Sequence, residues 1–205
     1  MTRRHSLSGS ALGVAAAAAL LAANVSAAQG AAWRVGGGEV KVVCPLTVGG
    51  SFEARTASLT GTLSLTTPHP PAFAGELLVD VRTLDTGIDL RSDHMRTQYL
   101  EVGRGPGFEA AVLSEIGLGD VDVETFQGRT VFTGTLQLHG AKSQVRGVAT
   151  IRREGGNVRV EASFPVKLSD FGIPPPRYLG VGVKSEVQVK VALTGTPETP
   201  GGSPR

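Results

Sequence analysis

The chain has 205 residues, of which 40% are hydrophobic, 19% are charged and 5% are aromatic, with 20 basic residues against 18 acidic ones. This length fits one domain with a substantial buried core. The near-neutral charge argues against nucleic acid as a partner, because phosphate binding requires a basic excess.

The first 28 residues have the features of a signal peptide. Arg3 and Arg4 give a basic start, residues 11–23 form an uncharged Ala/Leu-rich segment, and Val25-Ser26-Ala27 ends in the small residues that a signal peptidase requires. We expect residues 1–28 to be removed on export, which leaves a periplasmic or secreted protein with 18 basic and 18 acidic residues. The apolar segment is too short for a membrane span, so no stable membrane anchor is expected.

Apolar and polar side chains alternate with period two through most of the remaining chain. A weak first strand begins near Val40 and Val42. Clearer strands are predicted over residues 58–66, 76–82, 130–138, 145–151, 158–166 and 183–193. Strict alternation buries one face of a sheet and leaves the other in water, which is typical of antiparallel sheets.

The connections between these strands favour hairpins. Residues 139–142 and 155–157 are short and Gly-containing, and no segment between strands is a helix long enough for a parallel crossover. Seven or eight such strands either close into a barrel or stack as a sandwich. Glycines inside strands, at Gly61, Gly134 and Gly147, suit the bends of a coiled wall and favour the barrel.

Residues 83–102 interrupt this β pattern with a polar cluster in a short turn-plus-helix. The cluster contains Arg91, Asp93, His94 and Arg96. One interpretation is a polar rim that contacts a ligand, because arginine suits phosphate and carboxylate groups. The other is structural: Asp93 pairs with a nearby arginine, and the segment plugs or braces the barrel.

The order of several short motifs carries a family resemblance. They are Gly50-Ser-Phe-Glu53, Val79-Asp-Val-Arg-Thr-Leu-Asp-Thr-Gly87, Asp93-His-Met-Arg96, Tyr99-Leu-Glu-Val102, Phe132-Thr-Gly-Thr-Leu-Gln-Leu-His-Gly140 and Ser169-Asp-Phe-Gly-Ile173. Over residues 33–196 this set resembles the YceI-like family of exported lipid- or polyisoprenoid-binding proteins. The chain departs from the family in two places. The family often has aromatic and His residues in its first strands, where this chain has Val42-Val43-Cys44-Pro45, and the acidic loop between Asp120 and Arg129 differs from the usual segment.

The resemblance implies an all-β, antiparallel, eight-stranded lipocalin-like barrel with a short helical or turn insertion near residues 91–100. Residues 33–196 would form the barrel domain, and residues 197–205 a disordered tail. The family holds a long apolar chain in the pore. From the pattern alone a solid, filled core fits as well; the resemblance favours a ligand.

The expected binding residues fall into two groups. The inward side chains of the strands would line the pore: Leu63, Leu65, Val79, Val81, Phe132, Leu136, Leu138, Phe164 and Val189. Arg91, Asp93, His94 and Arg96 would form the polar rim.

We therefore expect a protein that binds an amphipathic lipid such as a polyisoprenoid, for carriage or sequestration, and that is not an enzyme. Two alternatives stay open. The first is an enzyme acting on a lipid or its head group, with His94 and Asp93 as acid/base candidates; the second is a structural or stress-associated barrel without a ligand. A homodimer is possible if the barrel is partly open at an edge.

No cofactor and no metal site are expected. His69, His94 and His139 are scattered, and no motif for a nucleophile occurs. Asp85 and Asp89 have the spacing of a carboxylate pair, but solvated turn acids explain them better. The single Cys44 excludes an internal disulfide and is expected to be a small buried residue, with a reactive thiol as the alternative.

Overall fold

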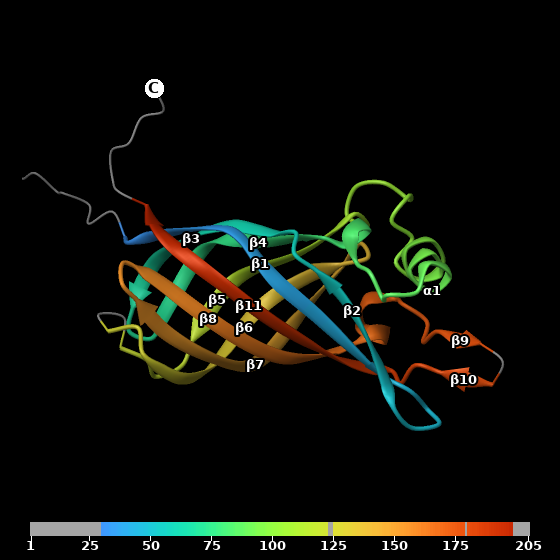
Figure 1. The fold of residues 1–205 in the computed structure, drawn as a ribbon. Helices are drawn as coiled ribbons and strands as arrows, with labels where there is room; N and C mark the ends of the chain where they lie inside the picture. The colour runs from blue at the N-terminus through green and yellow to red at the C-terminus, as the bar shows by residue number, and fades with distance from the viewer. Residues whose placement is uncertain (1–29, 123–124, 179, 199–205) are drawn as a thin grey trace, which may run out of the picture.

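A computed structural model describes residues 30–122, 125–178 and 180–198, and its main body is a closed β-barrel (Figure 1). Eight antiparallel strands follow one another around the wall, and the last pairs with the first to close it. In the order of their pairing they are β1 (Ala32–Pro45), β3 (Leu59–Pro68), β4 (Pro71–Asp80), β5 (Ala110–Leu118), β6 (Gly128–Leu138), β7 (Ala141–Glu154), β8 (Asn157–Lys167) and β11 (Glu186–Glu198). The predicted eight-stranded antiparallel barrel is confirmed.

Along one edge the first strand pairs with two strands in turn, because it bends at a run of glycines. Residues Ala32–Val35 pair with β3, whereas Val40–Pro45 pair with β2 (Ser51–Thr56). The pairing of β1 with β11 shifts register between Val35 and Gly38, at Gly36 and Gly37. Such bulges let a strand turn sharply. β2 therefore extends the wall beyond β3 at one end of the barrel.

The core lies inside the barrel, as the alternation predicts. On β8 the side chains of Val158, Phe164 and Val166 are buried, whereas Arg159 and Glu161 are exposed. Gly147 lets β7 approach this wall closely, because a Cβ at Gly147 would lie 2.6 Å from the Cβ of Phe164. The glycine is required by close packing of the wall.

Short elements gather at the end of the barrel that β2 extends (Figure 1). They are η1 (Val81–Thr83), α1 (Asp89–His94), the π-helical turn η2 (Met95–Tyr99), η3 (Leu168–Phe171), β9 (Arg177–Tyr178) and β10 (Val181–Gly182). α1 and η2 form the helical insertion expected near residues 91–100. We call this end of the barrel the mouth and the opposite end the base.

Two elements differ from the expected boundaries. β5 was not predicted, because a register shift between Ser114 and Gly117, with Glu115 at φ 52°, breaks its alternation. β11 continues through Glu198, two residues past the expected domain end, because Glu198 pairs with Ala32 and forms an ion pair with Arg34 at 2.7 Å.

The expected signal peptide of residues 1–28 and the rest of the expected tail, residues 199–205, lie outside the described residues. Within the described residues, no helix has the length and apolar character to cross a membrane.

Candidate functional site

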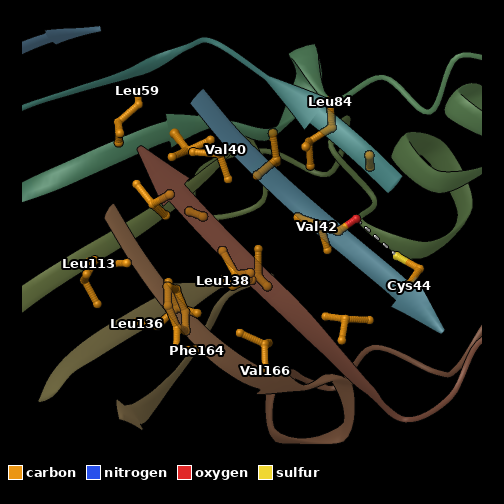
Figure 2. A pocket seen from close by; sticks show the side chains of 18 of the residues that line it. Val40, Val42, Cys44, Leu59, Leu84, Leu113, Leu136, Leu138, Phe164 and Val166 are labelled. Carbon is orange, nitrogen blue, oxygen red and sulfur yellow. Dashed lines mark hydrogen bonds between the residues drawn. The ribbon is translucent and has the colours of Figure 1, made fainter. Parts of the chain in front are cut away.

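The barrel encloses a cavity of about 900 Å³ (Figure 2). All eight strands of the wall and β2 contribute side chains to it, most of them aliphatic or aromatic. The volume is at the upper end of the range of small-molecule pockets. The interior therefore has the size and chemistry of a site for an apolar chain.

Aromatic rings form the base of the cavity. The ring of Trp33 lies edge-on to Phe126 with centroids 5.1 Å apart, and edge-on to Phe73 at 6.1 Å. All three rings are buried and line the cavity. Phe126 comes from the segment between β5 and β6, so this segment folds in against the base. The cavity has an aromatic floor at the base and its polar lining at the mouth.

Eight of the nine expected pore-lining residues line this cavity: Leu63, Val79, Val81, Phe132, Leu136, Leu138, Phe164 and Val189. Figure 2 shows Leu136, Leu138 and Phe164 among the side chains of the wall. Leu65 packs against the core without lining the cavity. Leu65 pairs directly with Phe73, one of the rings of the aromatic floor, so it lies at the level of the floor.

Arg91 is the central polar group at the mouth. Its Nη2 donates a hydrogen bond to the carbonyl oxygen of Thr86 at 2.8 Å, and its guanidinium carbon lies 4.3 Å from the centre of the Phe52 ring. Its Nε is buried and has no hydrogen-bond partner within the described structure. Burying an unsatisfied donor is unfavourable, so Arg91 has capacity for one further acceptor.

The structure separates the other three expected rim residues. His94 lines the cavity with Arg91, but Asp93 is exposed and does not. Arg96 does not line the cavity either, and its Nη1 donates to the carbonyl oxygen of Leu84 at 3.2 Å. Arg91 and His94 therefore come together at the mouth, whereas Arg96 braces the chain behind α1.

A further basic residue lies at the mouth that the sequence did not predict. Arg177, on β9, lines the cavity. Among the described residues that line it, Arg91, His94 and Arg177 are the basic ones, and no carboxylate side chain is present. The signal in the sequence was the run Pro174–Pro176, which presents the next residue on an extended segment. The mouth therefore favours an anionic or hydrogen-bond-accepting group.

Residues 33–195 match the sequence pattern of the YceI-like domain. The chain belongs to the YceI-like family. None of the curated proteins compared with it matches its sequence. Two solved structures share its fold. BcnA of Burkholderia cenocepacia is 18% identical, with a TM-score of 0.61 over 77% of this chain and 96% of that one. A polyisoprenoid binding domain from Saccharophagus degradans, implicated in plant cell wall breakdown, is 16% identical, with a TM-score of 0.60 over 81% and 98%.

The mouth of this YceI-like barrel is held in place by Asp85. Its Oδ1 accepts hydrogen bonds from the backbone N–H of Gly87 at 3.0 Å and from Oγ of Ser92 at 2.8 Å. These bonds hold the pKa of the Asp85 carboxyl below its usual value of 3.8. Backbone bonds in both directions join Asp85 to Arg55 on β2. Asp85 thus anchors α1 to the wall; Asp89 is exposed in the first turn of α1.

His139 connects three segments near the mouth without lining the cavity. Its Nδ1 lies 2.9 Å from the carbonyl oxygen of Phe171, and its Nε2 lies 2.9 Å from Oε2 of Glu101. Its ring also packs edge-on against Phe108. His139 therefore joins the β6–β7 turn, η3 and the segment after η2.

Among the described residues, His, Cys, Asp and Glu side chains form no group of three able to hold a metal ion.

Cys44 is buried on β1, lines the cavity and forms no disulfide (Figure 2). Burial raises the pKa of its thiol to about 11, although the nearby Arg91 lowers it in part. The thiol is therefore protonated near neutral pH and behaves as a small apolar wall residue.

Proposed function

We propose that this protein binds an amphipathic lipid, with the apolar chain in the cavity and the polar head at the mouth, for carriage or sequestration. The proposal rests on one observation: the lining of the cavity changes from apolar at the base to polar at the mouth. Its interior and base are walled by aliphatic and aromatic side chains, and its cations lie at the mouth. An apolar chain gains about 0.8 kcal/mol for each methylene that it buries.

A polyisoprenoid is the cargo that this proposal favours. The structure from Saccharophagus degradans, which shares the fold, is described as a polyisoprenoid binding domain. A branched, flexible chain also suits a wall of Leu, Val and Ala side chains, which make many weak dispersion contacts. The leader-like N-terminus supports export, so the site of action would be the periplasm or the cell exterior.

The head group of the cargo would be anionic, with phosphate or carboxylate as the matching chemistry. Arg91 has a buried Nε without a partner, and Arg177 and His94 line the same opening. Arginine recognises such groups through several parallel hydrogen bonds. No carboxylate among the described lining residues opposes this charge.

Organic extraction of the protein purified from its native compartment, followed by mass spectrometry, tests the proposal. A long-chain amphipathic lipid is expected in the extract. The variant Leu136→Arg, which places a charge in the cavity wall, is expected to lose the lipid. Thr133→Arg is the matched control, because Thr133 lies on the same strand with its side chain exposed.

The outcomes separate the candidate functions. An empty extract, together with failure of the purified protein to bind added polyprenols and polyprenyl phosphates, would contradict the proposal and favour a barrel without a ligand. Turnover of a lipid phosphate that disappears in His94→Ala would instead indicate an enzyme.

The head group is tested separately. Alkyl phosphates and alkyl alcohols of equal chain length are compared by isothermal titration calorimetry. Arg177→Gln is expected to weaken phosphate binding by about tenfold or more, since a hydrogen bond to a charged group contributes roughly 1.5–3 kcal/mol, and to leave the alcohol unchanged. Arg159→Gln, on the exposed outer face of β8, is the control. Equal losses for both ligands would contradict an anionic head group.

A further inference from the structure

The exposed apolar side chains of this protein are concentrated at one end. The described residues include five large apolar side chains with high exposure. Four belong to the mouth: Val48 (68%), Leu90 (64%), Ile88 (54%) and Val181 (37%). We call these four residues the mouth rim. The fifth, Val131 (38%), lies on β6 outside the mouth.

The mouth rim is built from three separate segments. Val48 stands on the turn between β1 and β2, which is closed by a bond from the N–H of Leu46 to the carbonyl oxygen of Gly50 at 3.0 Å. The φ of Gly49, +96°, is a value that side chains disfavour, so the turn requires glycine there. Ile88 and Leu90 lie at the start of α1, and Val181 is on β10. Three separate segments at the mouth therefore contribute to the rim.

Two hydrogen bonds fix two of these segments to each other. The N–H of Thr47 donates to the carbonyl oxygen of Gly182 at 2.8 Å, and the N–H of Gly182 donates to Oγ1 of Thr47 at 3.0 Å. The β1–β2 turn and the β9–β10 hairpin thus form one tip of the molecule (Figure 1). Ile88, Leu90 and Val181 also line the cavity, so the rim is continuous with the cavity wall.

The form of the rim fits a bilayer better than a protein partner. A stable protein interface has a tightly packed, fully buried centre, whereas here the centre is the opening of the cavity. A fluid bilayer needs no complementary shape and accepts scattered apolar side chains at its headgroup–acyl boundary. Exposed apolar patches of this kind mark protein or membrane contacts.

The charges around one side of the mouth also fit contact with a lipid bilayer. The β1–β2 turn, residues 45–51, carries no charged residue, and the segment 174–185 carries Arg177 and Lys184 without an acid. Exposed acids, Asp89 and Asp93, lie on the α1 side. The tip formed by the turn and the hairpin is therefore the side suited to an anionic lipid surface, where each Lys or Arg adds to binding.

We infer that the mouth docks reversibly on a lipid bilayer through Val48, Ile88, Leu90 and Val181. The bilayer then meets the cavity opening directly, so a lipid chain passes between them without crossing water. The inference extends the proposed function and rests on it for the direction of transfer, but docking itself requires no cargo.

Flotation of the mature protein with phosphatidylcholine vesicles, with and without phosphatidylglycerol, tests the docking. The wild type is expected to float with the vesicles. Val48→Ser and Leu90→Ser are each expected to lower the partition coefficient by about tenfold, since each removes an apolar side chain from the boundary. Val131→Ser is the matched control and is expected to change nothing. Lys184→Gln is expected to lower binding about fivefold on anionic vesicles only.

A cavity variant separates this inference from the proposed function. Ala162→Phe adds a ring to the middle of the cavity wall, and it is expected to float like the wild type although it loses long-chain cargo. A wild type that binds cargo but does not float would overturn docking alone. Equal flotation of Val48→Ser, Leu90→Ser and Val131→Ser would do so as well. If the protein instead sediments as a dimer that the rim substitutions dissociate, the rim is a subunit interface and the inference is wrong.

Discussion

Blocking the cavity at mid-depth should convert a long-chain site into a short-chain site. Ala162 lines the cavity on β8 between Ala149 of β7 and Val191 of β11, so the neighbouring side chains leave room for a ring. Ala162→Phe fills the passage between the mouth and the base. Residues Val158 and Val160 lie on the base side of this position, and Phe164 and Val166 on the mouth side.

The size of the effect follows from the length of the cavity. The lining residues of β8 run from Val158 to Val166, which is about 26 Å at roughly 3.3 Å per residue. A strand tilt of about 40° reduces this to about 20 Å along the barrel axis. With C–C bonds of about 1.5 Å, a zigzag chain advances about 1.2 Å per bond, so about 16 carbons fit.

The ring in Ala162→Phe therefore excludes about eight of these carbons. At about 0.8 kcal/mol per methylene the loss is about 6 kcal/mol, which is an upper bound because ordering the chain costs free energy as well. We expect the affinity for a long chain to fall at least a hundredfold. A chain of about eight carbons needs only the mouth half, so its affinity should be unchanged.

Isothermal titration calorimetry with alkyl phosphates of increasing chain length measures this effect. The affinity of the wild type should rise up to about 16 carbons, whereas that of Ala162→Phe should stop rising at about eight. Ser163→Phe adds the same ring to the exposed face of β8 and serves as the control. The reasoning is refuted if both proteins show the same dependence on chain length while Ala162→Phe keeps its β-sheet circular dichroism.

Three further predictions concern the base, the thiol and the mouth. Phe126→Ala removes a ring of the aromatic floor and should lower the free energy of unfolding by about 3–5 kcal/mol in urea titrations. Cys44, with its pKa of about 11, should react slowly with iodoacetamide near neutral pH, and bound lipid should slow the reaction further. The pKa of Asp85 is lower in the folded protein than its usual value of 3.8. The carboxylate therefore stabilises the fold above pH 3.8, and this stabilisation is lost as the pH falls below that value. Thermal melts of Asp85→Asn should show a smaller loss of stability in acid.

The barrel wall could be predicted because its pattern is local and periodic. On β6 and β8 every second side chain faces the cavity, so inward residues such as Phe132, Leu136 and Phe164 follow from the sequence alone. β5 was missed because its bulge at Glu115 shifts the period within one strand. Leu65 was assigned to the pore because alternation gives the face of a residue but not its depth, and the position of the floor depends on Trp33 and Phe126, which are far apart in the chain.

The mouth could be predicted only in part, because non-local bonds place its residues. A short polar helix is visible in the sequence, and its period already places Arg91 and His94 on a different face from Asp93 and Arg96. Which of the two faces points to the cavity depends on how Asp85 anchors α1 to β2. Arg177 reaches the cavity because the β9–β10 hairpin is hydrogen-bonded to the β1–β2 turn. The two bonded residues, Thr47 and Gly182, are 135 residues apart in the chain. No local pattern specifies such a contact.

The two ends of the cavity together predict the orientation of the proposed ligand. Trp33, Phe73 and Phe126 form the floor at the base, so an apolar end packs there, whereas Arg91 and Arg177 lie where the head remains. Entry of the head first would bring an anion past the aliphatic wall, and removing a charge from water without a partner is strongly unfavourable. On the proposed function, the chain would therefore enter by its tail, and the head would stay at the opening beside the mouth rim. A lipid held in this way would keep its polar group at the surface from which it was taken and to which it could be returned.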